Sequence, residues 1–253
     1  MTFLSALFRP WVLWGGIVVA LLTIPLVASA KGGLSLTQTR VIFMQKEKST
    51  AITLVNRSKG PFLVKADITR EPGLRDAQPP AFMVTPPLFR VEPDSRHTVV
   101  IIRQGQASLP TDRESVFYAN FLAIPASSPS EGEETSGVAA QISLGISTTI
   151  KLFYRPTGLA MAASVAPEKL TFKATPSGVI VYNPTPYYVT LSQVSVNGVM
   201  VPLEYETAMV APFATQQWPS VGVSHGPIVW RAINDYGGET PAYHATLTSE
   251  TQP

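Results

Sequence analysis

The chain has 253 residues, a formal net charge of +2 and no cysteine. Such a small net charge gives no support to a protein that binds nucleic acid or a strongly anionic surface. The lack of cysteine excludes disulfides, thiolate metal sites and thiol nucleophiles, so a secreted form must be held together by its hydrophobic core.

The first 30 residues resemble a secretory signal peptide. Arg9 is the only charge before an apolar run at 11–27, and the small residues Ala28, Ser29 and Ala30 follow it. We expect cleavage after residue 30. An uncleaved membrane anchor is the alternative, although a spanning helix usually needs about 20 apolar residues.

After residue 30 the sequence lacks long helical periodicity and carries short β-rich runs separated by proline and glycine. This pattern predicts an all-β protein built from sandwiches. The pair Asn197-Gly198 between two apolar runs predicts a tight hairpin. The expected strands are 34–43, 50–56, 62–69, 98–103, 115–124, 139–154, 170–174, 178–183, 188–196, 216–218, 228–233 and 243–248.

The best domain boundary is the segment Arg155-Pro156-Thr157-Gly158, where proline and glycine can end a sheet and bend the chain. It divides the chain after the signal segment into domains at 31–156 and 157–253. The small, polar and acidic residues at 126–137 cannot bury a face and predict a flexible loop.

The stretch that follows this loop has an unusual strand pattern. Ile142, Leu144 and Ile146 alternate with Ser143, Gly145 and Ser147, so the apolar side chains share one face. No charge or proline occurs at 139–150, although exposed strand edges normally carry such residues. The strand is either an ordinary sandwich strand or an edge that pairs with another protein.

The motifs of an enzyme are missing from the sequence. The histidines His97, His225 and His244 have no metal-ligand spacing, and we interpret them as surface or loop residues. There is no glycine-rich phosphate loop and no Gly-x-Ser-x-Gly nucleophile motif. We therefore expect neither catalysis nor a cofactor or metal.

Two groups of charged residues lie near expected strand ends. Arg40 and Lys151 could meet in one cleft of the first domain, where two cations would suit a carboxylate. For each alone, a solvent-facing strand residue is the alternative. Glu114 and Arg155 of the first domain and Asp235 of the second could form an ion network that fixes the geometry between the domains.

Motifs along the whole chain resemble the PapD-like periplasmic chaperones of pilus assembly. They occur in the order of that family and span both domains. The matching pieces are TRV at 39–41, TPP at 85–87 with VEP at 91–93, LP at 109–110 with DRES at 112–115, IKLFYRP at 150–156, NPTPYYV at 183–189, ETAM at 206–209 with Pro212, and INDYGG at 233–238.

The resemblance implies two immunoglobulin-like sandwiches in an L or boomerang arrangement, and an ATP-independent chaperone of the periplasm. Such chaperones bind, fold and cap pilus subunits by lending them a strand, a form of β-augmentation, and deliver them to an outer-membrane usher. Here the lent strand would be 139–150. Ile142, Leu144 and Ile146 would enter the subunit.

The resemblance also assigns roles to the charged residues. Arg40 and Lys151 would anchor the subunit's C-terminal carboxylate, and Glu114, Arg155 and Asp235 would form the salt bridge between domains. No nucleotide is implied, and a homodimer that caps its own edge is possible for the free chaperone. The chain lacks the cysteine pair and long N-terminal arm common in the long-loop subfamily, which favours a short-loop chaperone with an enlarged loop.

Two other functions fit a secreted β-sandwich. The first is a structural fimbrial subunit or adhesin, but such a subunit would be one incomplete domain rather than two complete ones. The second is a carbohydrate-binding module or enzyme, but Trp218 and Trp230 form no patterned aromatic platform.

Overall fold

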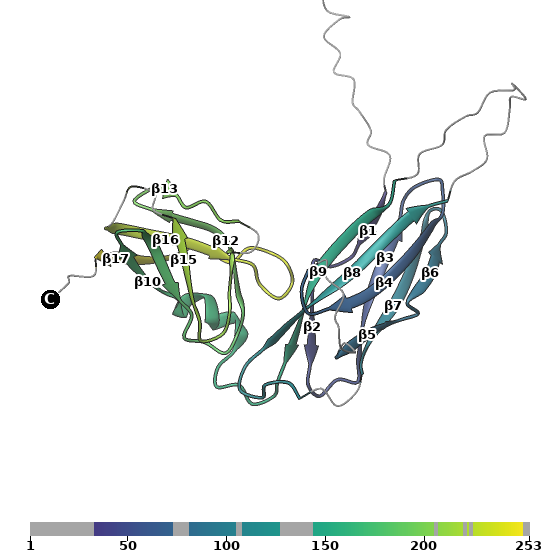
Figure 1. Cartoon of the computed structure of the whole chain (residues 1–253), viewed down its shortest axis with the longest axis horizontal. Coiled ribbons are helices and arrows are strands. Elements are labelled where there is room, and N and C mark those ends of the chain that lie inside the picture. Colours follow the sequence, from purple (N-terminus) through teal and green to yellow (C-terminus); the bar gives the residue numbers. More distant parts are fainter. Residues whose placement is uncertain are drawn as a thin grey trace, which may run out of the picture. The chain divides into compact units, whose positions relative to one another are not determined.

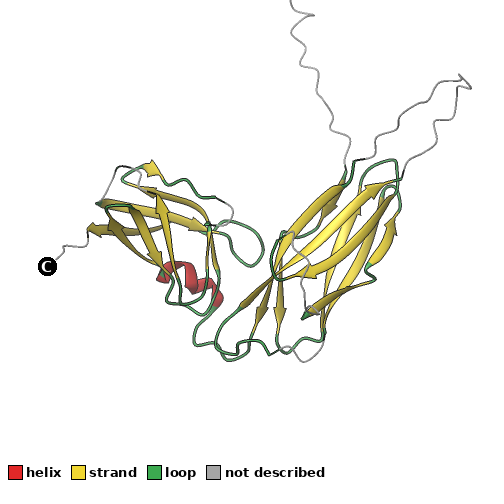
Figure 2. Ribbon diagram, in the orientation of Figure 1, coloured by secondary structure: helices red, strands yellow, loops and turns green. Residues whose placement is uncertain are grey.

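A computed structural model describes residues 33–72, 81–104, 108–126, 144–204, 207–219, 222 and 225–249. These residues belong to one compact unit and are mostly in β-strands, with one short 3-10 helix, η1 (Ala163–Lys169) (Figures 1 and 2). Within this part of the chain, no helix is long and apolar enough to span a membrane. The expected signal segment at 1–30 and the acidic residues at 127–137 lie outside it.

The first of two hydrophobic cores is enclosed by two sheets. At its centre the ring of Phe82 meets Phe43 and Phe117 edge-on, each at a centroid distance of 5.0 Å. One sheet has the order β1 (Leu34–Leu36), β3 (Ser49–Asn56), β7 (Ser95–Arg103), β5 (Phe82–Thr85), and the other β2 (Arg40–Met44), β9 (Ile146–Arg155), β8 (Ser115–Pro125), β4 (Phe62–Thr69), β6 (Leu88–Val91).

Alternation along the strands explains which residues enter this core. In β4, Phe62, Val64, Ala66 and Ile68 are buried, whereas Leu63 between the first two is exposed. All neighbouring strands of these two sheets pair antiparallel except β2 and β9, which run parallel. This parallel pair carries the candidate functional site described below.

The prediction of a single strand at 34–43 is wrong. The structure has β1 and β2, which belong to different sheets. Leu34 and Leu36 pack on the core from even positions, while Val41 and Phe43 are buried from odd positions. One straight strand cannot face both sets inward, because its side chains alternate strictly.

The second core lies among the strands that follow residue 170. The indole N–H of Trp218 donates to the carbonyl of Thr207 at 3.0 Å, and that of Trp230 to the carbonyl of Pro167 at 2.9 Å, so both rings are buried with their polar atoms bonded. The strands pair in the order β13 (Val199–Met200), β12 (Val189–Val196), β16 (Gly226–Ala232), β17 (Tyr243–Ser249), β10 (Thr171–Thr175), β11 (Gly178–Tyr182), β15 (Thr215–Pro219), and β14 (Met209–Val210) also pairs with β12.

The last strand links the two layers of this second sandwich. The first five residues of β17 pair antiparallel with β16, and its last two described residues pair parallel with β10. A strand shared in this way closes one side of the sandwich and leaves it with fewer open edges.

In each domain a buried asparagine side chain forms hydrogen bonds with backbone groups of a nearby turn. The side-chain amide of Asn56 donates to the carbonyls of Gly60 at 2.9 Å and Glu92 at 2.9 Å, and its oxygen accepts the backbone N–H of Ser58. Asn183 likewise donates to the carbonyl of Tyr187 at 2.7 Å and accepts the N–H of Thr185. Both amides satisfy backbone groups that turns would otherwise leave buried and unbonded.

The hairpin predicted at Asn197-Gly198 is confirmed. Both residues have positive φ, 49° and 79°, and Val196 pairs with Val199 across the turn. The strands β5, β6, β13 and β14 were missed because each has four residues or fewer. The interpretation of His97 as a surface or loop residue is also wrong, because it lies half-buried in β7 and stacks on Phe89 at 4.5 Å.

Candidate functional site

The parallel pairing of β2 with β9 brings the two predicted cations together. Arg40 and Lys151 are direct partners in the register of this pair. In β9, Leu152 and Tyr154 enter the core, so Lys151, Phe153 and Arg155 lie on the opposite face, which also carries Arg40. One face of a single strand pair thus collects three cationic side chains.

Arg40 is held by a backbone group of the second domain. Its Nη1 donates to the carbonyl of Ile233 at 3.1 Å, and its guanidinium carbon lies 5.7 Å from the centre of the Phe153 ring. Its Nε is buried and has no hydrogen-bond partner within the described part of the chain. Burial lowers the pKa of Arg40, even though the charges of Asp235 and Glu114 oppose this effect.

Lys151 is buried to an unusual degree for a lysine, with 8% of its surface exposed. Burial, and then the like charge of Arg40, lower the pKa of Lys151 to about 8. Burial and mutual repulsion destabilise the positive charges of Arg40 and Lys151. An anion bound between them would offset both effects, so the pair should attract anions. The pair therefore suits a carboxylate.

The predicted ion network is assembled around Arg155. Its Nε donates to Glu114 Oε1 at 2.7 Å, and its two terminal nitrogens donate to the carboxylate of Asp235 at 2.7 and 2.9 Å. Glu114 also accepts the backbone N–H of Tyr188 at 2.9 Å. Three of these four charge-assisted hydrogen bonds join the first domain to the second, and the bond between Arg155 and Glu114 lies within the first.

Opposing effects act on the pKa values in this network. Burial would lower the pKa of Arg155, but its bonds to Asp235 and the charge of Glu114 outweigh burial and raise it. Burial raises the pKa of Glu114, whose side chain is only 2% exposed. Arg155 therefore stays charged, and it is the group that makes a buried Glu114 tolerable.

Further contacts between the domains surround this network. The guanidinium of Arg113 lies 4.9 Å from the centre of the Phe213 ring, and the rings of Phe153 and Tyr188 are 5.8 Å apart. The backbone N–H of Glu114 donates to the carbonyl of Pro186 at 2.9 Å. No local pattern in the sequence predicts these contacts, since each joins residues far apart in the chain.

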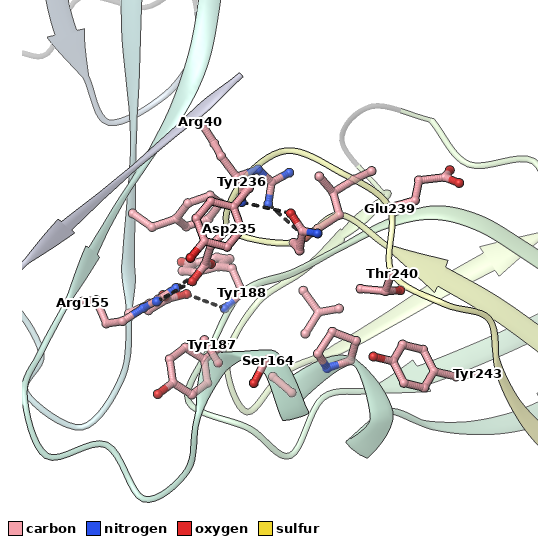
Figure 3. Close-up of a pocket in the computed structure, with 18 of the residues that line it drawn as sticks. Arg40, Arg155, Ser164, Tyr187, Tyr188, Asp235, Tyr236, Glu239, Thr240 and Tyr243 are labelled. Atoms are coloured by element: carbon pink, nitrogen blue, oxygen red, sulfur yellow. Dashed lines mark hydrogen bonds and ion pairs between the residues drawn. The ribbon is translucent and has the colours of Figure 1, made fainter. Parts of the chain in front are cut away.

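A cavity of about 530 Å³ opens beside Arg40. Figure 3 shows Arg40 and Arg155 on one side of it, with Asp235 and Tyr236 between them and Thr240 and Tyr243 on the other side. Its lining also includes Ser164 of η1. The cavity thus leaves open space next to Arg40.

The apolar stretch before Lys151 is accessible. Leu144 is 75% exposed and Ile146 is 50% exposed, whereas Ile142 lies outside the described residues. Strand β8 pairs with β9 from residue 146 onwards, but within the described residues no strand pairs with the other edge until β2 begins at Arg40. Of the expected strand at 139–150, residues 139–143 lie outside the described part of the chain. The expectation is wrong for Leu144 and Gly145, which are described but precede the first residue of β9, Ile146.

Comparisons with known proteins match both domains. The family model described as "Pili and flagellar-assembly chaperone, PapD N-terminal domain" matches residues 33–160. The model described as "Pili assembly chaperone PapD, C-terminal domain" matches residues 165–244.

Relatives and solved structures agree with these models. The chaperone protein FimB/FhaD of Bordetella pertussis is 37% identical over 88% of this chain and 91% of its own length, and the chaperone protein FimC of Escherichia coli is 34% identical over 84% and 83%. The chain is also similar to the crystal structure of the E. coli chaperone DraB, with a TM-score of 0.72, 30% identity and coverage of 85% and 97%. The Salmonella enterica SafA pilin in complex with the SafB chaperone gives a TM-score of 0.72 at 30% identity, with coverage of 85% and 96%.

These matches confirm the resemblance seen in the sequence and the fold of two immunoglobulin-like β domains. The family consists of periplasmic chaperones, which are a non-enzymatic class of protein. The chain therefore belongs to the PapD family of pilus-assembly chaperones, and its role is that of a chaperone for pilus subunits.

Proposed function

We propose that this chaperone caps an incomplete pilus subunit by pairing the open edge of β9, extended through residues 139–150, with the subunit's C-terminal strand. Arg40 and Lys151 bind the terminal carboxylate, and Ile142, Leu144 and Ile146 fill the gap in the subunit core. The observation that carries this proposal is the register that sets Arg40 opposite Lys151 where the free edge ends.

The charges determine the direction of the bound strand. Strand β2 runs parallel to β9 and starts at Arg40, so it occupies the continuation of the free edge. A subunit strand parallel to β9 would end beside Arg40 and Lys151 and place its carboxylate there. An antiparallel strand would begin at the same point and bring its ammonium group against two cations, which repel it.

The apolar residues supply binding energy, and the anchor supplies register. Each aliphatic side chain that leaves water contributes roughly 1.5–3 kcal/mol before ordering costs. A slip of one residue would turn every apolar side chain to the wrong face. Fixing one end of the subunit strand at Arg40 and Lys151 prevents that slip.

We infer the remaining partners from the resemblance to the family. The chain would reach the periplasm through cleavage of residues 1–30 and would hand its subunit to an outer-membrane usher without using a nucleotide. The free chaperone could cap its own edge as a homodimer. A pull-down in which the usher retains free chaperone as well as the chaperone–subunit complex would contradict this order of events.

Removing either cation tests the anchor. Arg40→Ala and Lys151→Ala should each weaken subunit binding roughly 10- to 100-fold, which corresponds to the 1.5–3 kcal/mol of a hydrogen bond to a charged group. Co-expression with a pilus subunit should show loss of subunit protection while the chaperone stays folded. Lys48→Ala, at an exposed lysine of the same domain, is the control. Normal protection by both variants would show that the anchor is wrong.

The pKa of Lys151 predicts a pH dependence. A bound carboxylate raises this pKa from its value of about 8, so binding takes up a proton at higher pH. Affinity should be constant below about pH 7 and fall by up to tenfold per pH unit above pH 8. The probe is an N-acetylated peptide of alternating valine and serine, prepared as the C-terminal acid and as the amide. Titration calorimetry should show the fall for the acid alone, and Lys151→Gln should abolish it; a flat profile to pH 9.5 would contradict the prediction.

A charge on the lent strand tests its apolar face. Leu144→Glu should reduce subunit binding about tenfold or more, since a carboxylate would have to enter the subunit core. The fold should remain intact, because Leu144 is 75% exposed in the free protein. Ser147→Glu is the matched control, as Ser147 pairs with the outward-facing Leu122. Unfolding of the Leu144 variant would instead indicate an ordinary sandwich strand.

We propose that the Arg155 network holds the two domains in their binding arrangement. Asp235→Ala removes the bonds of Arg155 to the second domain and keeps its bond to Glu114. It should cost about 1 kcal/mol, because the Asp235 side chain is 40% exposed. Small-angle scattering should show a broader distribution of interatomic distances. Glu239→Ala, at an exposed acid in the same region, should leave the profile unchanged. Identical profiles for both variants would refute the structural role.

A further inference from the structure

The loop between β16 and the bridge residue Glu239 is fixed by its own hydrogen bonds. Ile233 and Glu239 form an isolated β-bridge that closes the loop. The side-chain oxygen of Asn234 accepts the N–H groups of Tyr236 at 2.9 Å and Gly238 at 3.0 Å. The backbone of Asn234 exchanges two further bonds with Gly237 and Gly238. Residues 234–238, here called the Asn234 loop, therefore form a compact unit.

This loop contacts the first domain at three places. Asp235 binds Arg155, the carbonyl of Ile233 at the base of the loop accepts a bond from Arg40, and Gly237 lies against the side chain of Thr39. Figure 3 shows Asp235 and Tyr236 beside Arg40. Two of the three contacts fall on consecutive residues, Thr39 and Arg40, where β2 begins.

Gly237 has no room for a larger residue. A Cβ atom at this position would overlap the hydroxyl of Thr39, and the φ of 85° also favours glycine. Gly238 next to it differs, because a Cβ there would approach Asn234 at 3.4 Å, a distance that allows small adjustments. The close approach of the two domains thus depends on Gly237 in particular.

We propose that the Asn234 loop of the second domain positions Arg40 for the subunit's carboxylate. The loop sets the Ile233 carbonyl at a fixed place, and this carbonyl holds one nitrogen of the guanidinium. The other donors of Arg40 then keep a fixed direction toward the anchor site. Asn234 and Gly237 act as positioning residues, although neither needs to touch the subunit.

The physical benefit is preorganisation. A free arginine side chain has many rotamers, and ordering it on binding lowers affinity. A guanidinium that is already oriented by one hydrogen bond loses less freedom when it binds a carboxylate. This inference rests on the proposed carboxylate anchor, and it adds the second domain to that anchor.

The test compares the acid and amide forms of the valine–serine peptide. The ratio of their affinities measures the carboxylate contribution alone, and unfolding would reduce both affinities together. In the unmodified protein the acid should bind roughly tenfold more tightly. Gly237→Ala should reduce this ratio at least threefold, with little change for the amide. Gly238→Ala is the matched control and should keep the ratio.

A second substitution, at Thr39, distinguishes the clash with Thr39 from backbone strain at position 237. Thr39→Ala removes the hydroxyl that a Cβ at position 237 would meet, so the double variant Gly237→Ala/Thr39→Ala should recover most of the ratio. Asn234→Ala loosens the loop without adding a clash and should also lower the ratio. This variant keeps the test decisive if Gly237→Ala does not fold.

Two outcomes would overturn the inference, and they differ from each other. If the unmodified protein prefers the acid but Gly237→Ala and Asn234→Ala retain that preference, the loop does not position Arg40, while the anchor stands. If the unmodified protein binds acid and amide equally, the carboxylate anchor itself is wrong, and the inference falls with it.

Discussion

The parallel pairing of β2 with β9 is the constraint on which the rest of the site depends. It is the one parallel pair in the described first domain, and it sets Arg40 beside Lys151. Because β2 starts at this point, the cations mark the end of the free β9 edge. The proposed binding edge, carboxylate anchor and strand direction all follow from this register.

Burying two adjacent cations is unfavourable, and a carboxylate of the second domain reduces this penalty. The pKa values of Arg40 and Lys151 are both lowered by burial, so their charged forms are held against an unfavourable environment. Asp235 reduces this effect at Arg40 while it binds Arg155. The same face of β9 therefore carries the proposed anchor at Lys151 and the ion pair between the domains at Arg155, four residues later.

Patterns in the sequence predicted features that depend on neighbouring residues, such as strands and turns. They did not predict contacts between residues that are far apart in the chain. Short β-rich runs bounded by proline and glycine predicted most of the longer strands, and the Asn197-Gly198 turn could be read directly. The change of phase between Leu36 and Val41 was visible in the sequence, but was not recognised as a switch between sheets. The Ile233 carbonyl and the contact of Gly237 with Thr39 could not be predicted, because they join segments almost 200 residues apart.

The buried asparagines have a consequence for how this protein can be produced. Asn56-Arg57-Ser58 is an acceptor sequence for N-linked glycans, whereas the equivalent Asn183-Pro184-Thr185 is not, because proline follows the asparagine. In a eukaryotic secretory pathway the glycan is attached while the chain is still unfolded. The amide of Asn56 would then carry a sugar where the folded domain needs its hydrogens for backbone carbonyls. Secretion from yeast or animal cells would thus take away part of this hydrogen bonding in the first domain, whereas a host that does not attach the glycan would preserve it.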